Sequence, residues 1–281
     1  MTLQTLPRSS TRSGAAYFDA GSGDETVVLV HGVGMRSEAW GPQIDRLARY
    51  CRVLAVDLPG HGSSAPLSGP PHLRHFVAWL RDVIEELAPG PVNIAGHSMG
   101  AMIAGGIAVE AAPLVRRVAL LNGVHRRSEA ARRAVIARAD EIATGAFDRE
   151  APLARWFSAD EGASPACVLA RELLACVDRE GYAAAYRAFA AGDDVYADCW
   201  PRVTCPALFL TGDGDMNSTP EMARAMAAAA PRGKAVVVEG HRHMVNLTAP
   251  DAVNECLADW LTWKTAAETG EGNDDRSQSP A

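Results

Sequence analysis

Short apolar runs alternate along the chain with longer segments that have helical spacing. The runs are bounded by turn residues and rich in Val, Leu, Ile and Ala, a composition typical of strands buried on both faces of a parallel sheet. Strands are expected at residues 26–30, 52–56, 92–95, 117–121, 207–211 and 235–238. Helices are expected between them at residues 73–87, 99–112, 220–230 and 251–263. This order predicts an α/β fold with a mostly parallel central sheet flanked by helices.

The alternation stops between about residues 126 and 198, where no convincing strand occurs. Helical stretches fill this interval instead, at residues 128–144, 167–178 and 182–190. A sheet interrupted for so long indicates an inserted unit, so we predict a helical lid at residues 125–199 over the functional site. The core then consists of residues 15–124 and 200–264.

The two ends of the chain have a different composition. Residues 1–14 are polar and are expected to be flexible, and residues 265–281 are rich in Gly, Glu, Asp, Asn and Ser, which predicts a disordered tail. The N-terminus has no apolar signal-peptide region, and no run of about 18 apolar residues occurs. We therefore expect a cytoplasmic protein that does not insert into a membrane.

Charge and cysteine usage narrow the function classes. The chain has 27 basic and 34 acidic residues, a formal net charge of -7, which argues against binding to nucleic acid and favours a small-molecule substrate. The six cysteines are scattered without a CxxC pair, so neither a disulfide framework nor a zinc site is indicated. No cofactor is expected, and the oligomeric state stays open.

The motif GHSMG at residues 96–100 lies between an apolar run and a helical one. The pattern GxSxG is weak alone, but a serine at a tight turn from strand to helix is lifted clear of the sheet. The helix that follows directs its N–H groups and its positive dipole end toward the reaction centre. Ser98 is therefore the candidate nucleophile, and the Met99 N–H is the first candidate oxyanion donor.

A second glycine turn, HGVG at residues 31–34, follows the apolar run that ends at Val30. Glycine lets the backbone turn sharply there and present an amide to the end of a neighbouring strand. The Val33 N–H is the second candidate oxyanion donor. A histidine before such a turn is more often structural than catalytic, which is the favoured interpretation of His31.

Four motifs together resemble the α/β-hydrolase superfamily. They are HGVG at residues 31–34, DLPGHGSS at residues 57–64, GHSMG at residues 96–100 and HMVNLTAPDAV at residues 243–253. The resemblance runs from about residue 17 to residue 263, and the motifs occur in the family's order. It implies an α/β-hydrolase fold, with its catalytic groups in the chain order Ser, acid, His.

The resemblance also implies which residues are the acid and the base. The family's acid stands three residues after the glycine that ends its strand, which selects Asp215 and leaves Asp213 as the fallback. The family's histidine stands seven residues before the proline of the last helix, which selects His243 over His241. Some members carry the acid after the preceding strand, but Asn122-Gly123 stands there, with no carboxylate.

Further residues are candidates for contact with the substrate. A histidine pair such as His241 and His243 can bind zinc, but a metal would need a further ligand cluster, and none is evident. Arginines at the start of the lid could bind a carboxylate, although a solvated helix face is the stronger interpretation. The expected substrate contacts are His31, His97, Arg126, Arg127 and Trp156.

These residues predict hydrolysis through an acyl-enzyme, with a small carboxylic ester as the expected substrate. Lactones, thioesters and amides are neighbouring possibilities. Carbon–carbon hydrolases of this fold usually resemble GNSMG, whereas His97 stands before the serine here, and cofactor-free perhydrolysis uses the same groups. A ligand receptor of the same fold, without turnover, is the alternative outside enzymology.

Overall fold

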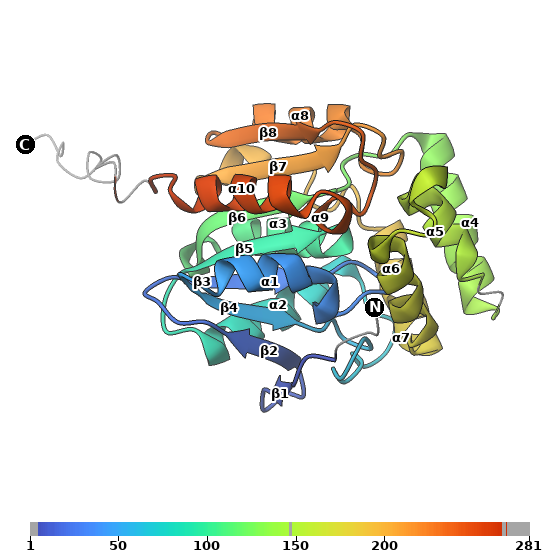
Figure 1. Cartoon of the computed structure of the whole chain (residues 1–281), viewed down its shortest axis with the longest axis horizontal. Coiled ribbons are helices and arrows are strands. Elements are labelled where there is room, and N and C mark those ends of the chain that lie inside the picture. Colours follow the sequence, from blue (N-terminus) through green and yellow to red (C-terminus); the bar gives the residue numbers. More distant parts are fainter. Residues whose placement is uncertain (1–4, 146–147, 266–267, 269–281) are drawn as a thin grey trace, which may run out of the picture.

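Eight strands form one sheet in the computed structural model, which describes residues 5–145, 148–265 and 268 (Figure 1). The strand order is β1-β2-β4-β3-β5-β6-β7-β8. β1 pairs antiparallel with β2, and β2 pairs antiparallel with β4. The other six strands are parallel to one another. Their bounds are β1 Ser9–Ser10, β2 Ala16–Ala20, β3 Thr26–Val30, β4 Arg52–Val56, β5 Val92–His97, β6 Val115–Leu121, β7 Ala207–Gly212 and β8 Gly233–Val238.

All six predicted strands are present, and the two that were not predicted lie at the N-terminal edge of the sheet. In β2 only the first of five residues is fully buried, so the strand lacks the apolar run that marks the others. The two-residue β1 is too short to produce a pattern. Edge strands of this kind leave a weak signal because only part of their surface packs against the core.

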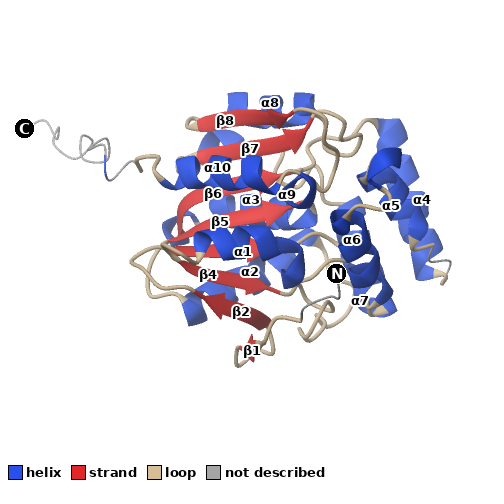
Figure 2. Ribbon diagram, in the orientation of Figure 1, coloured by secondary structure: helices blue, strands red, loops and turns tan. Residues whose placement is uncertain are grey.

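Helices cover both faces of the sheet (Figure 2). Helix α1 packs on one face with α10, around the buried Trp40 and Trp260, while α2, α3 and α8 pack on the other. The helix bounds are α1 Gly41–Leu47, α2 Leu73–Leu87, α3 Met99–Glu110, α4 Glu129–Ala143, α5 Glu150–Trp156, α6 Pro165–Ala175, α7 Arg179–Ala190, α8 Pro220–Ala229, α9 Val245–Thr248 and α10 Pro250–Leu261. None of these described helices is long and apolar enough to cross a membrane.

Four helices, α4 to α7, form a cap between β6 and β7, beside the carboxyl ends of the parallel strands (Figure 1). Three of them match helical stretches expected from the sequence. The fourth, α5, is only seven residues long and was not predicted. Ligands bind at the carboxyl edge in open α/β sheets, so the cap covers the edge where a site is expected.

Residues 1–14 were expected to be flexible; the structure describes residues 5–14 of this segment, and Arg8 makes ion pairs with the core. The Arg8 guanidinium pairs with Asp57 at 2.8 Å and with Glu38 at 2.7 Å, and both carboxylates are buried. Burial alone would raise the pKa of Asp57, but the Arg8 hydrogen bond and charge help to hold it below its ordinary value. Ion pairing therefore ties this segment to the core despite its polar composition. The predicted tail lies outside the described residues, apart from 265 and 268.

Candidate active site

Ser98 lies between β5 and α3 in a strained backbone conformation. Its φ of 55° and ψ of -115° fall outside the ordinary regions for an L-residue. Its N–H donates to the Leu121 carbonyl at 2.9 Å, which anchors the turn to the neighbouring strand β6. The residue is 7% exposed, so Ser98 lies almost entirely within the protein.

Glycines at positions 96 and 100 make this turn possible. A Cβ added to Gly96 would lie 2.1 Å from the Gly100 carbonyl oxygen, and one added to Gly100 would lie 2.1 Å from the Val30 carbonyl oxygen. Both obstacles are backbone atoms, which cannot rotate away. The close approach of β5, α3 and β3 thus requires the two glycines of the motif.

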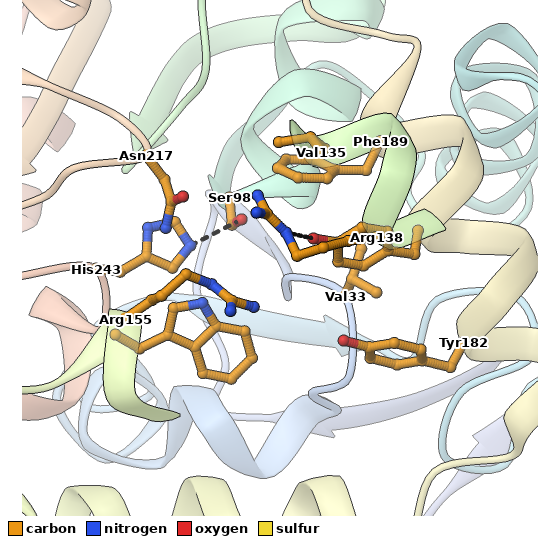
Figure 3. A pocket seen from close by; sticks show the side chains of 11 residues that line it. Val33, Ser98, Val135, Arg138, Arg155, Tyr182, Phe189, Asn217 and His243 are labelled. Carbon is orange, nitrogen blue, oxygen red and sulfur yellow. Dashed lines mark hydrogen bonds between the residues drawn. The ribbon is translucent and has the colours of Figure 1, made fainter. Parts of the chain in front are cut away.

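A chain of hydrogen bonds joins Ser98, His243 and Asp215. The His243 Nε2 lies 3.0 Å from the Ser98 Oγ (Figure 3), and the His243 Nδ1 lies 2.8 Å from the Asp215 Oδ2. The other oxygen of Asp215 accepts from the backbone N–H groups of Asn217 and Ser218. Burial raises the pKa of Asp215, but the charge and hydrogen bond of His243, with the other donors, bring it below its ordinary value.

The two rival residues take part in other contacts. Asp213 is exposed, and its carboxylate accepts from the Gly240 N–H at 2.8 Å. The His241 Nδ1 lies 2.9 Å from the Thr248 hydroxyl. Both interactions hold the loops after β7 and β8 in shape, and the structure brings Asp215 and His243 to Ser98 instead.

Two backbone N–H groups are available near the serine hydroxyl. Met99 is the first residue of α3, where an N–H has no acceptor within the helix, and Val33 lies in the turn after β3 and lines the same cavity as Ser98. Neither N–H donates to an acceptor in the described part of the chain. The pair has the composition of an oxyanion hole.

Two buried histidines brace the loop that carries Val33. The His31 Nδ1 donates to the Gly32 carbonyl, and its Nε2 accepts from the Leu58 N–H at 2.8 Å. In the opposite direction, the His61 Nε2 accepts from the Gly34 N–H at 3.0 Å. Burial lowers the pKa of both rings, that of His31 to about 3, so both act as neutral acceptors. His31 is therefore a structural residue and does not contact the cavity.

His97 supports the base from behind. Its Nε2 donates to the His243 backbone carbonyl at 2.7 Å, and its ring stands edge-on to Trp40. Burial lowers the pKa of His97 to about 3, which keeps the ring neutral. His97 was expected to contact the substrate, but in the structure it packs against the ring of His243 and does not line the cavity.

A cavity opens above Ser98, with a volume of about 430 Å³ including its open mouth. The core supplies Val33, Ser98, Asn217 and His243, while the cap supplies a mostly aromatic and cationic wall (Figure 3). The cap residues are Val135, Arg138, Arg155, Trp156, Tyr182, Tyr186 and Phe189. Within this wall the Trp156 ring stacks on the ring of His243, with 6.0 Å between the ring centroids.

Two arginines give this wall its charge. The Arg138 Nε donates to the Tyr186 hydroxyl at 3.2 Å, and Arg155 lies near both. Among the described carboxylates, none lies within 4.0 Å of either guanidinium. Burial lowers the pKa of Arg155, and the positive charge of Arg138 acts in the same direction. The charge of Asp148 acts on Arg155 in the opposite direction, but neither guanidinium has an ion-pair partner among the described residues, so both can bind a further negatively charged group.

The arginines expected to contact the substrate lie elsewhere. Arg126 is exposed and pairs with Asp198, and Arg127 is buried against Asp193 at 3.1 Å, with its guanidinium 4.3 Å from the centre of the Phe189 ring. Neither residue lines the cavity above Ser98, because the chain turns at Arg126, whose φ is 46°, before α4 begins. Trp156 does line the cavity, as expected.

Sequence reasoning missed Arg138 and Arg155. On α4 the inward positions Val135, Arg138 and Ile142 are spaced by three and four residues, and this spacing places Arg138 on the apolar side of the helix. Arg155 lies on α5, a helix that was not predicted. No group of three or more His, Cys, Asp or Glu side chains that could hold a metal occurs among the described residues.

Several known proteins are similar to this chain in sequence and structure. A hydrolase of (E)-2-((N-methylformamido)methylene)succinate from Acinetobacter baylyi is 49% identical over 261 residues, which cover 93% of this chain and 98% of the relative. An enol-lactonase from Burkholderia xenovorans superposes with a TM-score of 0.80 at 28% identity, over 92% of this chain and 100% of that chain. An esterase from Thermogutta terrifontis, 24% identical, shares the fold with a TM-score of 0.81 over 92% of this chain and 98% of that chain.

The family model described as "Alpha/beta hydrolase family" matches residues 27–256. This match spans the sheet from β3 to α10, including the turn at Ser98 and the whole cap. The expected fold is therefore confirmed, and the chain belongs to the alpha/beta hydrolase family.

Proposed function

We propose that this protein is a serine hydrolase that cleaves an ester or amide bond in a small substrate carrying carboxylate groups. The observation that carries the proposal is the unbroken hydrogen-bonded chain from the Ser98 hydroxyl through His243 to the buried Asp215. This arrangement of nucleophile, base and orienting acid is suited to acyl transfer.

In the proposed reaction, His243 takes the proton of Ser98 as the Oγ attacks the substrate carbonyl. The Asp215 carboxylate holds the imidazole tautomer and stabilises the imidazolium that forms. The N–H groups of Val33 and Met99 donate to the oxyanion, and His243 returns the proton to the leaving alcohol or amine. Water then attacks the acyl-enzyme by the same route and releases the acid.

The cap supports the substrate class. Arg138 and Arg155 face the cavity without carboxylate partners, so a substrate carboxylate can pair with either. The relative with 49% identity is named for a succinate, a dicarboxylate, that also bears a formamide. We therefore place dicarboxylates with an N-acyl or O-acyl group first among candidate substrates.

The test compares acyl dicarboxylates with their neutral diesters in wild type, Arg138→Gln and Arg155→Gln. A charge-assisted hydrogen bond contributes about 1.5–3 kcal/mol, so each variant should lose about 10- to 100-fold in kcat/KM for the dicarboxylate. The neutral compound should be turned over equally by all three. Arg126→Gln is the matched control, because it removes the same charge from the exposed start of the cap.

Equal losses on both substrates would contradict the carboxylate assignment. A wild-type protein that binds these compounds without turnover would favour the receptor alternative. Turnover only of substrates cleaved at a carbon–carbon bond would favour a carbon–carbon hydrolase. Turnover only with peroxide would favour perhydrolysis.

A further inference from the structure

Asn122 lies at the carboxyl end of β6, between the strand that anchors Ser98 and the loop that carries Asp215. It is fully buried and has a φ of 50°. Its backbone N–H donates to the Leu210 carbonyl at 2.7 Å, and its carbonyl accepts from the Ser218 hydroxyl at 2.6 Å. The residue is thus fixed to β7 and to the loop that follows β7.

The side-chain amide of Asn122 reaches the acid and the loop that carries the base. Its Nδ2 lies 2.8 Å from the Asp215 Oδ2, the oxygen that also faces the His243 Nδ1. The same nitrogen lies 3.3 Å from the Arg242 carbonyl, one residue before the base, and 3.2 Å from the Thr211 hydroxyl. One amide therefore contacts the loops after both β7 and β8.

The side-chain oxygen of Asn122 has no such contacts. Its Oδ1 is buried and has no hydrogen-bond partner among the described residues. Leaving a buried acceptor unpaired costs about 1–3 kcal/mol, and a glycine would satisfy the positive φ without that cost. Tolerance of the backbone conformation alone thus does not account for an amide at this position.

We infer that Asn122 is a positioning residue for the reaction, which holds the Asp215 carboxylate and the loop before His243 in the arrangement that orients the base. The inference rests on the proposed function. Without the Asn122 donor the Asp215 carboxylate can rotate. The tautomer and ring orientation of His243 then become less well defined. The Asn122 hydrogen bond also contributes to the lowered pKa of Asp215, after burial and the larger effects of His243.

The decisive variant is Asn122→Gly, which suits the positive φ and removes the amide. We expect kcat to fall about 10- to 100-fold, the equivalent of about 1.4–2.8 kcal/mol, with KM within twofold of wild type. Thr211→Val is the matched control, because it removes another contact of the same nitrogen, and the Thr211 hydrogen bond to the Ser218 carbonyl, but none of the donors to the acid. Its kcat should stay within threefold of wild type.

A second variant, Asn122→Asp, separates positioning from packing. Asp tolerates the same backbone, and its protonated form can donate to Asp215 whereas its ionised form repels it. The ratio of kcat in Asn122→Asp to kcat in Asn122→Gly should therefore rise as the pH falls from about 9 to about 6. A purely structural role predicts a constant ratio.

An Asn122→Gly enzyme with wild-type kcat would overturn the inference, and so would an equal loss in Thr211→Val. The proton on the His243 Nδ1, observed by NMR, gives a readout that needs no substrate. Its resonance should shift or broaden in Asn122→Gly and stay in place in Thr211→Val. A wild-type protein without turnover would defeat the proposed function alone, whereas an unmoved resonance would defeat the role of Asn122.

Discussion

The residues around Ser98 combine local strain with close backbone packing. Ser98 holds an unfavourable φ of 55°, and this conformation persists because β3, β5 and α3 approach one another at Gly96 and Gly100. The strain raises the hydroxyl toward the cavity, where His243 meets it. The packing of these elements stabilises the strained backbone of Ser98, which the short motif alone could not maintain.

Substituting Gly100 tests this packing. In Gly100→Ala the new Cβ would lie 2.1 Å from the Val30 carbonyl oxygen, so we expect the free energy of unfolding to fall by about 3 kcal/mol or more. Gly41→Ala is the control, because no atom lies within 4 Å of its added Cβ and alanine suits a helix better than glycine. Urea denaturation measures both. A Gly100→Ala protein as stable as wild type would show that the turn is not packed in this way.

Residues differ in how far the sequence predicted their roles. Ser98 and the two glycines were predictable because strand, turn and helix are adjacent in the chain. Asp215 and His243 followed from the spacing of a resembling family. The spacing on α4 places Arg138 on an apolar helix face, but no local pattern shows that the cap brings it over Ser98, and Arg155 lies on a helix that was not predicted. The sequence indicated only that Asn122 is not a carboxylate. Its contact with Asp215 depends on the pairing of β6 with β7.

At the scale of elements, the loop after β3 depends on neighbours that no local pattern reveals. Its Gly34 N–H donates to His61 of the loop after β4, and its His31 accepts from the Leu58 N–H of that loop. The β4 loop is anchored in turn by Asp57, which accepts from Ser37 and from Arg8 of the N-terminal segment. The helices and strands were mostly predictable from periodicity, but these polar links between loops were not.

Removing Arg8 tests the role of the N-terminal segment. In Arg8→Gln the buried Asp57 and Glu38 lose their shared cation, so we expect the protein to be destabilised by about 3 kcal/mol. Arg12→Gln, at an exposed neighbouring position, should change stability by no more than about 0.5 kcal/mol. Thermal or urea unfolding measures the difference. Equal stability of the two variants would mean that residues 5–14 do not anchor the β4 loop.

At the scale of the whole molecule, buried neutral histidines make the fold sensitive to acid. Burial lowers the pKa of His31 and of His97 to about 3 and also lowers that of His61, whereas the unfolded chain has ordinary histidines with a pKa near 6.5. Between these values the unfolded state binds more protons than the folded state. The stabilisation is therefore complete above about pH 6.5 and is lost as the pH falls toward about 3.

This linkage predicts a steep pH dependence of stability. Each fully buried histidine contributes a slope of up to about 1.4 kcal/mol per pH unit, so the free energy of unfolding should fall by more than about 2 kcal/mol between pH 6 and pH 5. Urea unfolding at several pH values measures the slope. His72→Gln, at an exposed position, should leave it unchanged. A flat profile from pH 7 to pH 5 would mean that these histidines are not buried as neutral rings.

The most direct measurement is the mass of the protein after reaction with a fluorophosphonate, combined with turnover of an acyl substrate. We predict one adduct, mapped to Ser98, and none in Ser98→Ala, which should also lose turnover. Asp215→Asn should lower kcat by as much as about 10⁴-fold, while Asp213→Asn should retain it. An adduct or full turnover in Ser98→Ala, or equal losses in the two aspartate variants, would contradict the proposed roles of Ser98, His243 and Asp215.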